Sequence, residues 1–176
     1  MRVVMGIDPG TANLGFGVVR VEGGHMVAVD GGVIETRSDE AIEKRLAHIH
    51  SALADLIAWH QPAAMAIEDL YFGKNVGSAM KVGQASGVAM LAAAQGGVSC
   101  FAYTPQAIKT AVCGSGNAAK RQVQKMVATL LGLSEAPRSD HAADALAVAI
   151  CHGGTAGRRD AIAAAAAARP SVRVAG

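Results

Sequence analysis

Residues of types that bind metal ions stand at three points where the chain should change direction. Asp8 ends the apolar run "VVMGID", and Glu68 ends the apolar run "AAMAIE". His141 and Asp144 are three residues apart near the start of a segment with helical spacing, which places them on one face of a helix. Asp8 taken alone is also explained by the turn "DPGT", because Asp often caps its own loop.

Carboxylates that meet at one point need a cation between them. If the strands that end in Asp8 and Glu68 are neighbours, these side chains lie side by side and raise each other's pKa. Oxygen ligands favour hard divalent ions such as Mg²⁺ or Mn²⁺. Two such ions, about 3.5–4 Å apart, can activate a water and hold the leaving oxygen of a phosphodiester. We therefore interpret Asp8, Glu68, His141 and Asp144 as candidate ligands of a nuclease, although each one singly is also compatible with an ordinary turn or surface role.

Asp140, beside His141, is expected to complement the helix dipole rather than to bind the metal, and it is also a candidate to support a metal ligand.

Positive charge is concentrated in the middle of the chain. The segment from Leu70 to Ser134 contains no Asp or Glu, and its basic residues are Lys74, Lys81, Lys109, Lys120, Arg121 and Lys125. Positive segments of this kind attract polyanions, most often phosphate backbones. Within it, "CGSGNAAKRQVQKMV" is a glycine-rich loop leading into a helix, so that backbone amides and ammonium groups can both meet a phosphate. The alternative is a solvated basic face without a partner.

The composition fits one compact domain. The 176 residues are 51% hydrophobic and 17% charged, with a net charge of +2. The N-terminus reaches Asp8 after only a few apolar residues, so we expect neither a signal peptide nor a membrane span, and a cytoplasmic location. We expect a folded domain over residues 1–155 and a flexible alanine-rich tail over residues 156–176.

The elements that must position the candidate residues alternate between strand and helix. Three apolar stretches joined by glycine-containing turns predict an antiparallel meander. An amphipathic helix follows, with Ser38 as its expected N-cap, then the strand ending in Glu68, a helix over about 78–94, and a strand "VSCFAY". Two strands that arrive through helical crossovers extend the meander to an α/β fold with a mixed five-stranded sheet and helices on both faces.

Three more helices complete the pattern. Thr104 is expected to cap the first and Ser139 the last. The helix between them is expected to have Val123, Val127 and Leu130 on its apolar side. In open sheets of this kind, sites form at strand ends.

The chain resembles bacterial RuvC Holliday junction resolvases, which are endonucleases of the ribonuclease H-like superfamily. The resemblance runs from Met1 to about His152 and rests on motifs in the family's order: "GIDPG", "IEDLYFG", "KNVGSAMKVGQASGVAM", "TPQAIKTAVCGSGNAAKRQVQKMV" and "ADALAVAICH". The set is highly specific, whereas "GIDPG" alone would be a weak signal.

The resemblance implies a ribonuclease H-like fold and a metal-binding tetrad of Asp8, Glu68, His141 and Asp144, with two Mg²⁺ ions per active site. His141 stands where many members carry Asp, and imidazole suits Mn²⁺ better than Mg²⁺. The implied reaction resolves a Holliday junction by two symmetric metal-dependent nicks near the crossover, leaving 5′-phosphate and 3′-hydroxyl ends.

The resemblance also implies contacts to DNA and to proteins. Tyr71 falls where many members have Phe and would stack against bases, Lys74 lies in the family's "KN" loop, and Lys109 and Lys120 would contact junction phosphates. With the other basic residues of the acid-free segment, the expected DNA-binding set is Tyr71, Lys74, Lys81, Lys109, Lys120, Arg121 and Lys125. The family acts as a homodimer with the branch-migration proteins RuvA and RuvB, and no membrane is involved.

Three other classes of protein are also compatible with these sequence features. An ATPase or sugar kinase of the actin-like superfamily also carries an Asp-x-Gly-Thr phosphate loop, but it needs two lobes, for which 176 residues leave little room. A catalytically inactive DNA-binding module would keep the basic segment without needing metal ligands. A ribonuclease H-like nuclease acting on another substrate would share the tetrad.

Overall fold

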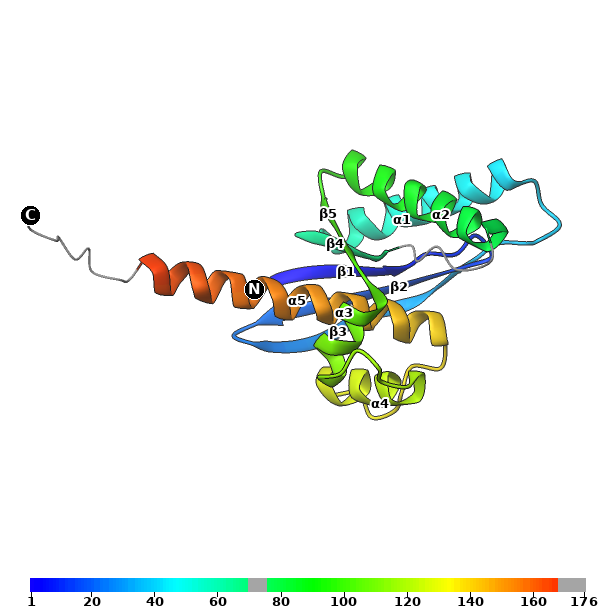
Figure 1. The fold of residues 1–176 in the computed structure, drawn as a ribbon. Helices are drawn as coiled ribbons and strands as arrows, with labels where there is room; N and C mark the ends of the chain where they lie inside the picture. Colours follow the sequence, from blue (N-terminus) through cyan, green and yellow to red (C-terminus); the bar gives the residue numbers. More distant parts are fainter. Residues whose placement is uncertain (70–75, 168–176) are drawn as a thin grey trace, which may run out of the picture.

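The computed structural model describes the backbone of residues 1–69 and 76–167. Its elements follow the predicted order of strands and helices (Figure 1). They are β1 (Arg2–Asp8), β2 (Asn13–Glu22), β3 (His25–Glu35), α1 (Ile42–His60), β4 (Ala64–Glu68), α2 (Val76–Gln95), β5 (Ser99–Tyr103), α3 (Pro105–Cys113), α4 (Lys120–Leu131) and α5 (Asp140–Ala167).

The five strands form one mixed sheet in the order β3-β2-β1-β4-β5. The strands β1, β2 and β3 pair antiparallel, which confirms the predicted meander. The strands β4 and β5 extend it in parallel, each reached through a helical crossover. The predicted fold class is therefore confirmed.

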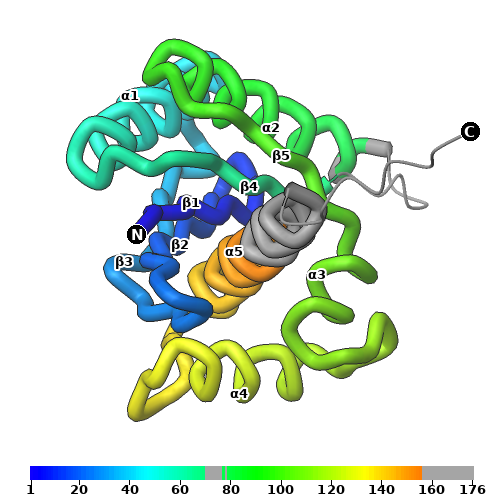
Figure 2. The backbone as a smooth tube through the Cα atoms, turned by 90° about the vertical axis from the view of Figure 1, so that its left-hand side faces the viewer, coloured from blue at the N-terminus to red at the C-terminus, as the bar shows by residue number. Residues whose placement is uncertain are grey.

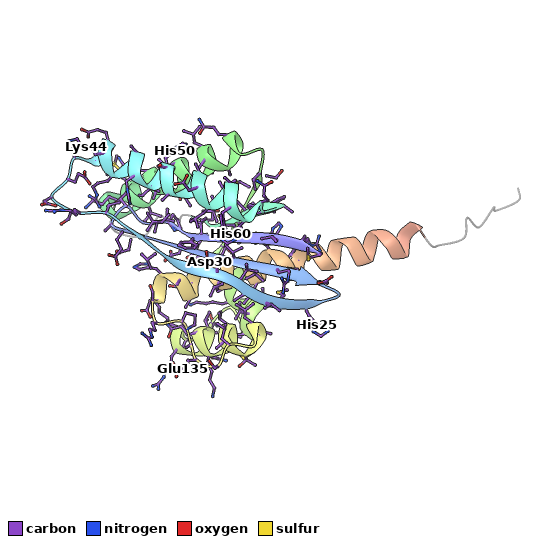
Figure 3. The ribbon with its side chains drawn as sticks, turned by 180° about the vertical axis from the view of Figure 1, so that it is seen from behind. His25, Asp30, Lys44, His50, His60 and Glu135 are labelled. Carbon is purple, nitrogen blue, oxygen red and sulfur yellow. The ribbon has the colours of Figure 1, made fainter. Side chains whose placement is uncertain are left out.

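Helices cover both faces of the sheet, as Figure 2 shows in a view along α5: α1 and α2 lie on one side, and α3, α4 and α5 on the other. Alternate residues of β1 serve the two cores, because Val4 packs with α3, α4 and α5 whereas Met5 packs with α1 and α2. On the α1 side, His60 Nε2 lies 2.9 Å from Asp30 Oδ2 on the edge strand β3 (Figure 3). This contact ties the end of α1 to the edge of the sheet.

Glycines in the sheet let α5 approach the strands closely. A Cβ at Gly6 would clash with the carbonyl of Ala145, one at Gly15 with the carbonyl of His141, and one at Gly17 with Leu146. Gly6 and Gly17 are directly paired between β1 and β2. The N-terminal half of α5 therefore rests on strand backbone rather than on side chains.

Two local predictions are wrong. Ser38 does not cap α1, because the helix begins at Ile42 after Ala41, and the turn before it is held by an ion pair of 2.6 Å between Arg37 and Asp39. Leu130 on α4 is exposed, and Leu131 takes the buried position instead.

The other capping predictions are confirmed: the Thr104 hydroxyl accepts a hydrogen bond from the Ala107 amide at 3.2 Å, and α5 begins directly after Ser139. Helix α5 continues without a break past residue 155 to Ala167, so residues 156–167 of the expected tail are helical. Within the described residues, no helix is both long and apolar enough to cross a membrane.

Candidate active site

The ends of β1 and β4 bring two carboxylates together. The strands are parallel neighbours, and Ile7 pairs with Ile67. Asp8 and Glu68 are the next residues of the two strands, so they end at the same edge of the sheet. Each closes a buried apolar strand and is itself only partly buried. The predicted juxtaposition of the two strand ends is confirmed. On the far side of β4, Glu68 is paired with Tyr103 of β5.

Helix α5 brings the third and fourth residues to this edge. His141 lies in its first turn, above Gly15, which is the residue of β2 that pairs with Asp8. His141 Nδ1 lies 2.7 Å from Asp8 Oδ2. The carboxylate of Asp8 thus has a partner from across the fold, beyond any role in its own turn.

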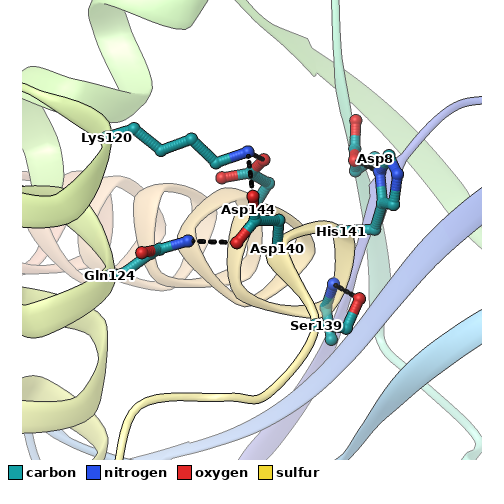
Figure 4. A network of polar contacts seen from close by, with 8 residues as sticks. Asp8, Lys120, Gln124, Ser139, Asp140, His141 and Asp144 are labelled. Carbon is teal, nitrogen blue, oxygen red and sulfur yellow. Dashed lines mark hydrogen bonds and ion pairs between the residues drawn. The ribbon is translucent and has the colours of Figure 1, made fainter.

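Lys120, at the start of α4, faces the same turn of α5 (Figure 4). Its Nζ lies 3.1 Å from Asp140 Oδ2 and 3.2 Å from Asp144 Oδ2. The amide of Gln124, one turn further along α4, donates to Asp140 Oδ1 at 2.6 Å. Asp140 therefore joins α5 to α4.

The pKa shifts of the acidic residues at this edge reflect burial and the closeness of other charges. Burial, together with the charges of Asp8 and Asp144, raises the pKa of Glu68 to about 7, against the lowering influence of Lys109 and Lys120. Burial also raises the pKa of Asp144, although Lys120 opposes this shift. The hydrogen bond from Lys120 lowers the pKa of the exposed Asp140. The carboxylates of Asp8, Glu68 and Asp144 therefore lie close together, and the nearby lysines do not fully offset their mutual repulsion and burial.

Among the described side chains, no group of three or more His, Cys, Asp or Glu is gathered closely enough to hold a metal ion. In this arrangement Asp8 Oδ2 contacts His141 Nδ1, and Asp144 Oδ2 contacts the ammonium of Lys120. The ends of β1 and β4 and the first turns of α5 therefore lie together, while the carboxylates of Asp8 and Asp144 each contact a basic side chain.

The structure brings together some of the expected DNA-binding residues and not others. Lys109 and Lys120 line one cavity of about 270 Å³ with Glu68 and Asp144, so these two cations adjoin the carboxylates. Arg121 and Lys125 are exposed on α4. Lys81 is exposed on α2, across the sheet from α4. Tyr71 and Lys74 lie outside the described residues.

Sequence reasoning missed the roles of Gln124 and of the glycines under α5. Gln124 has no sequence signal beyond its spacing of one turn from Lys120. The glycines do have one, because Gly6, Gly15 and Gly17 interrupt strands that are otherwise rich in large apolar residues, which marks a close backbone approach.

Comparisons with known proteins agree on one family. A family model described as crossover junction endodeoxyribonuclease RuvC matches residues 4–152. The RuvC of Rubrobacter xylanophilus is 50% identical over 151 residues, which cover 86% of this chain and 84% of that protein. The RuvC of Chloroflexus aggregans is 51% identical over 152 residues, covering 86% and 93%.

Solved structures give the same result. Thermus thermophilus RuvC, 41% identical, superposes with a TM-score of 0.84 over 89% of this chain and 96% of that chain. The same protein in complex with a Holliday junction substrate gives a TM-score of 0.87 over 90% and 97%. The yeast mitochondrial resolvase Ydc2, 12% identical with a TM-score of 0.64 over 90% and 82%, shares the fold. The chain belongs to the RuvC family of crossover junction endodeoxyribonucleases.

Proposed function

We propose that the chain resolves Holliday junctions in DNA recombination and repair by two symmetric metal-dependent nicks near the crossover, which leave 5′-phosphate and 3′-hydroxyl ends. Membership of the family supports the substrate class. The main structural support is the environment of Glu68: this carboxyl is partly buried beside Asp8 and Asp144, and its pKa is raised to about 7. A carboxylate in such a place is stabilised by a divalent cation.

The donor set fits hard divalent ions. Carboxylate oxygens of Asp8, Glu68 and Asp144 with the imidazole of His141 would hold two cations, Mg²⁺ or Mn²⁺, and the imidazole favours Mn²⁺ more than a fourth carboxylate would. When bound, such a pair activates an attacking water and stabilises the leaving oxygen of the phosphodiester. In the neutral imidazole, Asp8 fixes the Nδ1 proton of His141, so Nε2 is the nitrogen available to a metal.

Basic side chains around the carboxylates suit a phosphate backbone. Lys109 and Lys120, which line the cavity beside Glu68, would meet the phosphates nearest the cut. Arg121 and Lys125 on α4, and Lys81 on α2, would add contacts further out. Because the chain resembles the family at these positions, we also propose that Tyr71 stacks against bases and that Lys74 contacts a phosphate.

A homodimer matches the two-fold symmetry of a four-way junction, because two symmetric cuts need two active sites. The outward side of α2 supports this assembly: Met80, Met90 and Leu91 are exposed there, and Lys81 is the one charged residue of the helix. A small cavity of about 130 Å³ adjoins this side, lined by Met90 of α2, by Cys100 and Phe101 of the edge strand β5, and also by Glu68 and Asp69. A second copy of the chain would cover it.

The remaining parts of the proposal come from the family. We propose that residues 1–155 are the nuclease domain, which agrees with the matched range of residues 4–152, and that residues 156–176 lie outside it. RuvA and RuvB are the proposed protein partners, in the cytoplasm.

The deciding experiment is cleavage of end-labelled synthetic four-way junctions, mobile and fixed, beside a linear duplex and an RNA–DNA hybrid, in Mg²⁺, Mn²⁺ and EDTA. Paired metal-dependent nicks confined to the junctions support the proposal. Cutting of the hybrid alone assigns a ribonuclease H-like activity instead. Binding of junctions without cutting in either metal favours the inactive DNA-binding module, and ATP hydrolysis without DNA cutting favours an actin-like ATPase.

A further inference from the structure

The ammonium of Lys120 contacts two carboxylates on α5. Its ammonium lies 3.2 Å from Asp144 Oδ2 and 3.1 Å from Asp140 Oδ2. Because the two aspartates are one turn apart on α5, a single ammonium contacts both. Figure 4 shows the ammonium between the two carboxylates, on the side of the helix that faces α4.

We propose that Lys120 is an exchangeable counter-ion of Asp144. In the metal-free protein its ammonium neutralises this carboxylate, and when a divalent cation binds there, the ammonium moves away from Asp144 while it keeps Asp140. This inference rests on the proposed function, because it takes Asp144 as a metal ligand.

The two aspartates are not equivalent partners. Asp140 is 61% exposed at its side chain and is held independently by Gln124 at 2.6 Å, so it remains ordered when one partner changes. Asp144 is 30% exposed and lies beside Glu68 in the cavity wall. Asp140 is thus suited to anchor the lysine, and Asp144 is suited to exchange it.

The geometry leaves room for the movement. The Lys120 side chain is 55% exposed, and it lines a cavity of about 270 Å³ together with Lys109 and Glu68. A long flexible stem lets the ammonium turn away from Asp144, toward solvent and the exposed Asp140, without displacing the backbone of α4. The Gln124–Asp140 hydrogen bond continues to hold α4 against α5.

Electrostatics then couples metal binding to phosphate binding. An ammonium and a divalent cation repel each other, so they do not share one carboxylate at close range. The ammonium therefore weakens metal binding, and the metal releases an ammonium beside the DNA-facing cavity. Metal binding therefore raises the affinity of Lys120 for a phosphate. By linkage, a phosphate bound to Lys120 raises the metal affinity by that same factor.

The test is calorimetric titration of the full chain with Mn²⁺, without DNA, for the wild type, Lys120→Met and Lys44→Met. Lys44 is exposed on α1, on the opposite face of the sheet, so its removal matches the change in net charge (Figure 3). We expect Lys120→Met to bind Mn²⁺ roughly two- to fivefold more tightly, the factor of a partly exposed ion pair, and Lys44→Met to match the wild type.

Equal or weaker Mn²⁺ binding by Lys120→Met, with wild-type binding intact, would overturn the exchange and leave the proposed function standing. A wild-type chain that binds no Mn²⁺ would instead contradict the metal site itself, and with it the proposed function.

A second measurement does not depend on the stability of the variant. Reductive ¹³C-methylation keeps the lysine charge and gives each ammonium an NMR signal, and Lys120→Arg assigns the one from Lys120. Added Mg²⁺ should move the Lys120 signal and leave that of Lys44 in place. A Lys120 signal that stays fixed while Mg²⁺ saturates the site would also overturn the exchange.

Discussion

His141 Nδ1 lies 2.7 Å from Asp8 Oδ2, and this contact joins the end of β1 to the first turn of α5 across 133 residues of sequence. Since a carboxylate only accepts hydrogen bonds, the proton lies on Nδ1. The contact fixes the imidazole ring at the same edge as Glu68, so the positions of the candidate ligands depend on the docking of α5.

Asp8→Asn should abolish cleavage and preserve junction binding. The Asn side chain can still accept the hydrogen bond from His141, but it loses the charge that a divalent cation needs. We expect the cleavage rate to fall by more than about 100-fold, since even partners behind a metal ligand cost up to that factor. Cleavage assays and mobility shifts in EDTA measure the two effects. Asp55→Asn, on the exposed side of α1, is the matched control and should cut normally. Cutting by Asp8→Asn at the wild-type rate would refute the ligand assignment.

His141→Asp should keep activity with Mg²⁺ and shift the metal preference. A fourth carboxylate is a harder ligand than imidazole, so the ratio of the rate in Mg²⁺ to the rate in Mn²⁺ should rise several-fold, roughly. Single-turnover cleavage in each metal gives this ratio. Loss of activity in both metals would show that the imidazole does more than bind a cation.

The metal-free protein should lose stability as the pH rises from about 4.5 to 7. The pKa of Glu68 is raised to about 7 in the folded protein, chiefly by burial. The folded state therefore holds this proton more tightly than the unfolded state, and deprotonation disfavours folding. The penalty is absent below the unfolded pKa and complete above about 7. Its upper bound is roughly 3 kcal/mol, reduced by solvent screening.

Urea unfolding in EDTA at pH 5 and pH 8 measures this penalty. Glu68→Gln should be more stable than the wild type at pH 8 and nearly equal to it at pH 5. Added Mg²⁺ should stabilise the wild type at pH 8 and not the variant. Identical pH profiles for the two proteins would contradict the assigned electrostatics.

Leu91→Glu should separate the proposed dimer. A charge on the apolar outer side of α2 would be buried without a partner in a symmetric interface, which costs several kcal/mol by order of magnitude. Light scattering should show a monomer, and junctions should be nicked singly rather than in pairs. Trp59→Glu is the control, because Trp59 is 84% exposed on α1 and its loss should leave the assembly intact. A dimeric Leu91→Glu protein would place the interface elsewhere.

Gly15→Ala should disturb the site without touching a candidate ligand. The added methyl would clash with the carbonyl of His141, which forces α5 away from the sheet. Overpacking of this kind costs about 1–3 kcal/mol in the free energy of unfolding, and cleavage should fall further than stability because His141 moves from Asp8. Gly154→Ala, on α5 itself, meets only ordinary contacts and should be tolerated. Normal cleavage by Gly15→Ala would mean that the close packing is not required.

Local patterns in the sequence were sufficient to predict the order of strands and helices, and the strand-end positions of Asp8 and Glu68. Apolar periodicity, glycine turns and capping residues act over a few neighbouring residues, so they can be read without knowing the rest of the fold. Where two local signals competed, prediction failed. Ser38 is a good cap residue, yet the chain forms a turn there with Arg37 paired to Asp39, and α1 begins later.

The tertiary structure alone decided which partners the candidate residues have. The pairing of Lys120 with Asp144, the bond between His141 and Asp8, and the contact of α5 with Gly15 each join segments far apart in the chain. Spacing within a helix places residues on a face, but it does not say what that face meets. The raised pKa of Glu68 has the same origin, because burial and neighbouring charges exist only once the strands and α5 have packed.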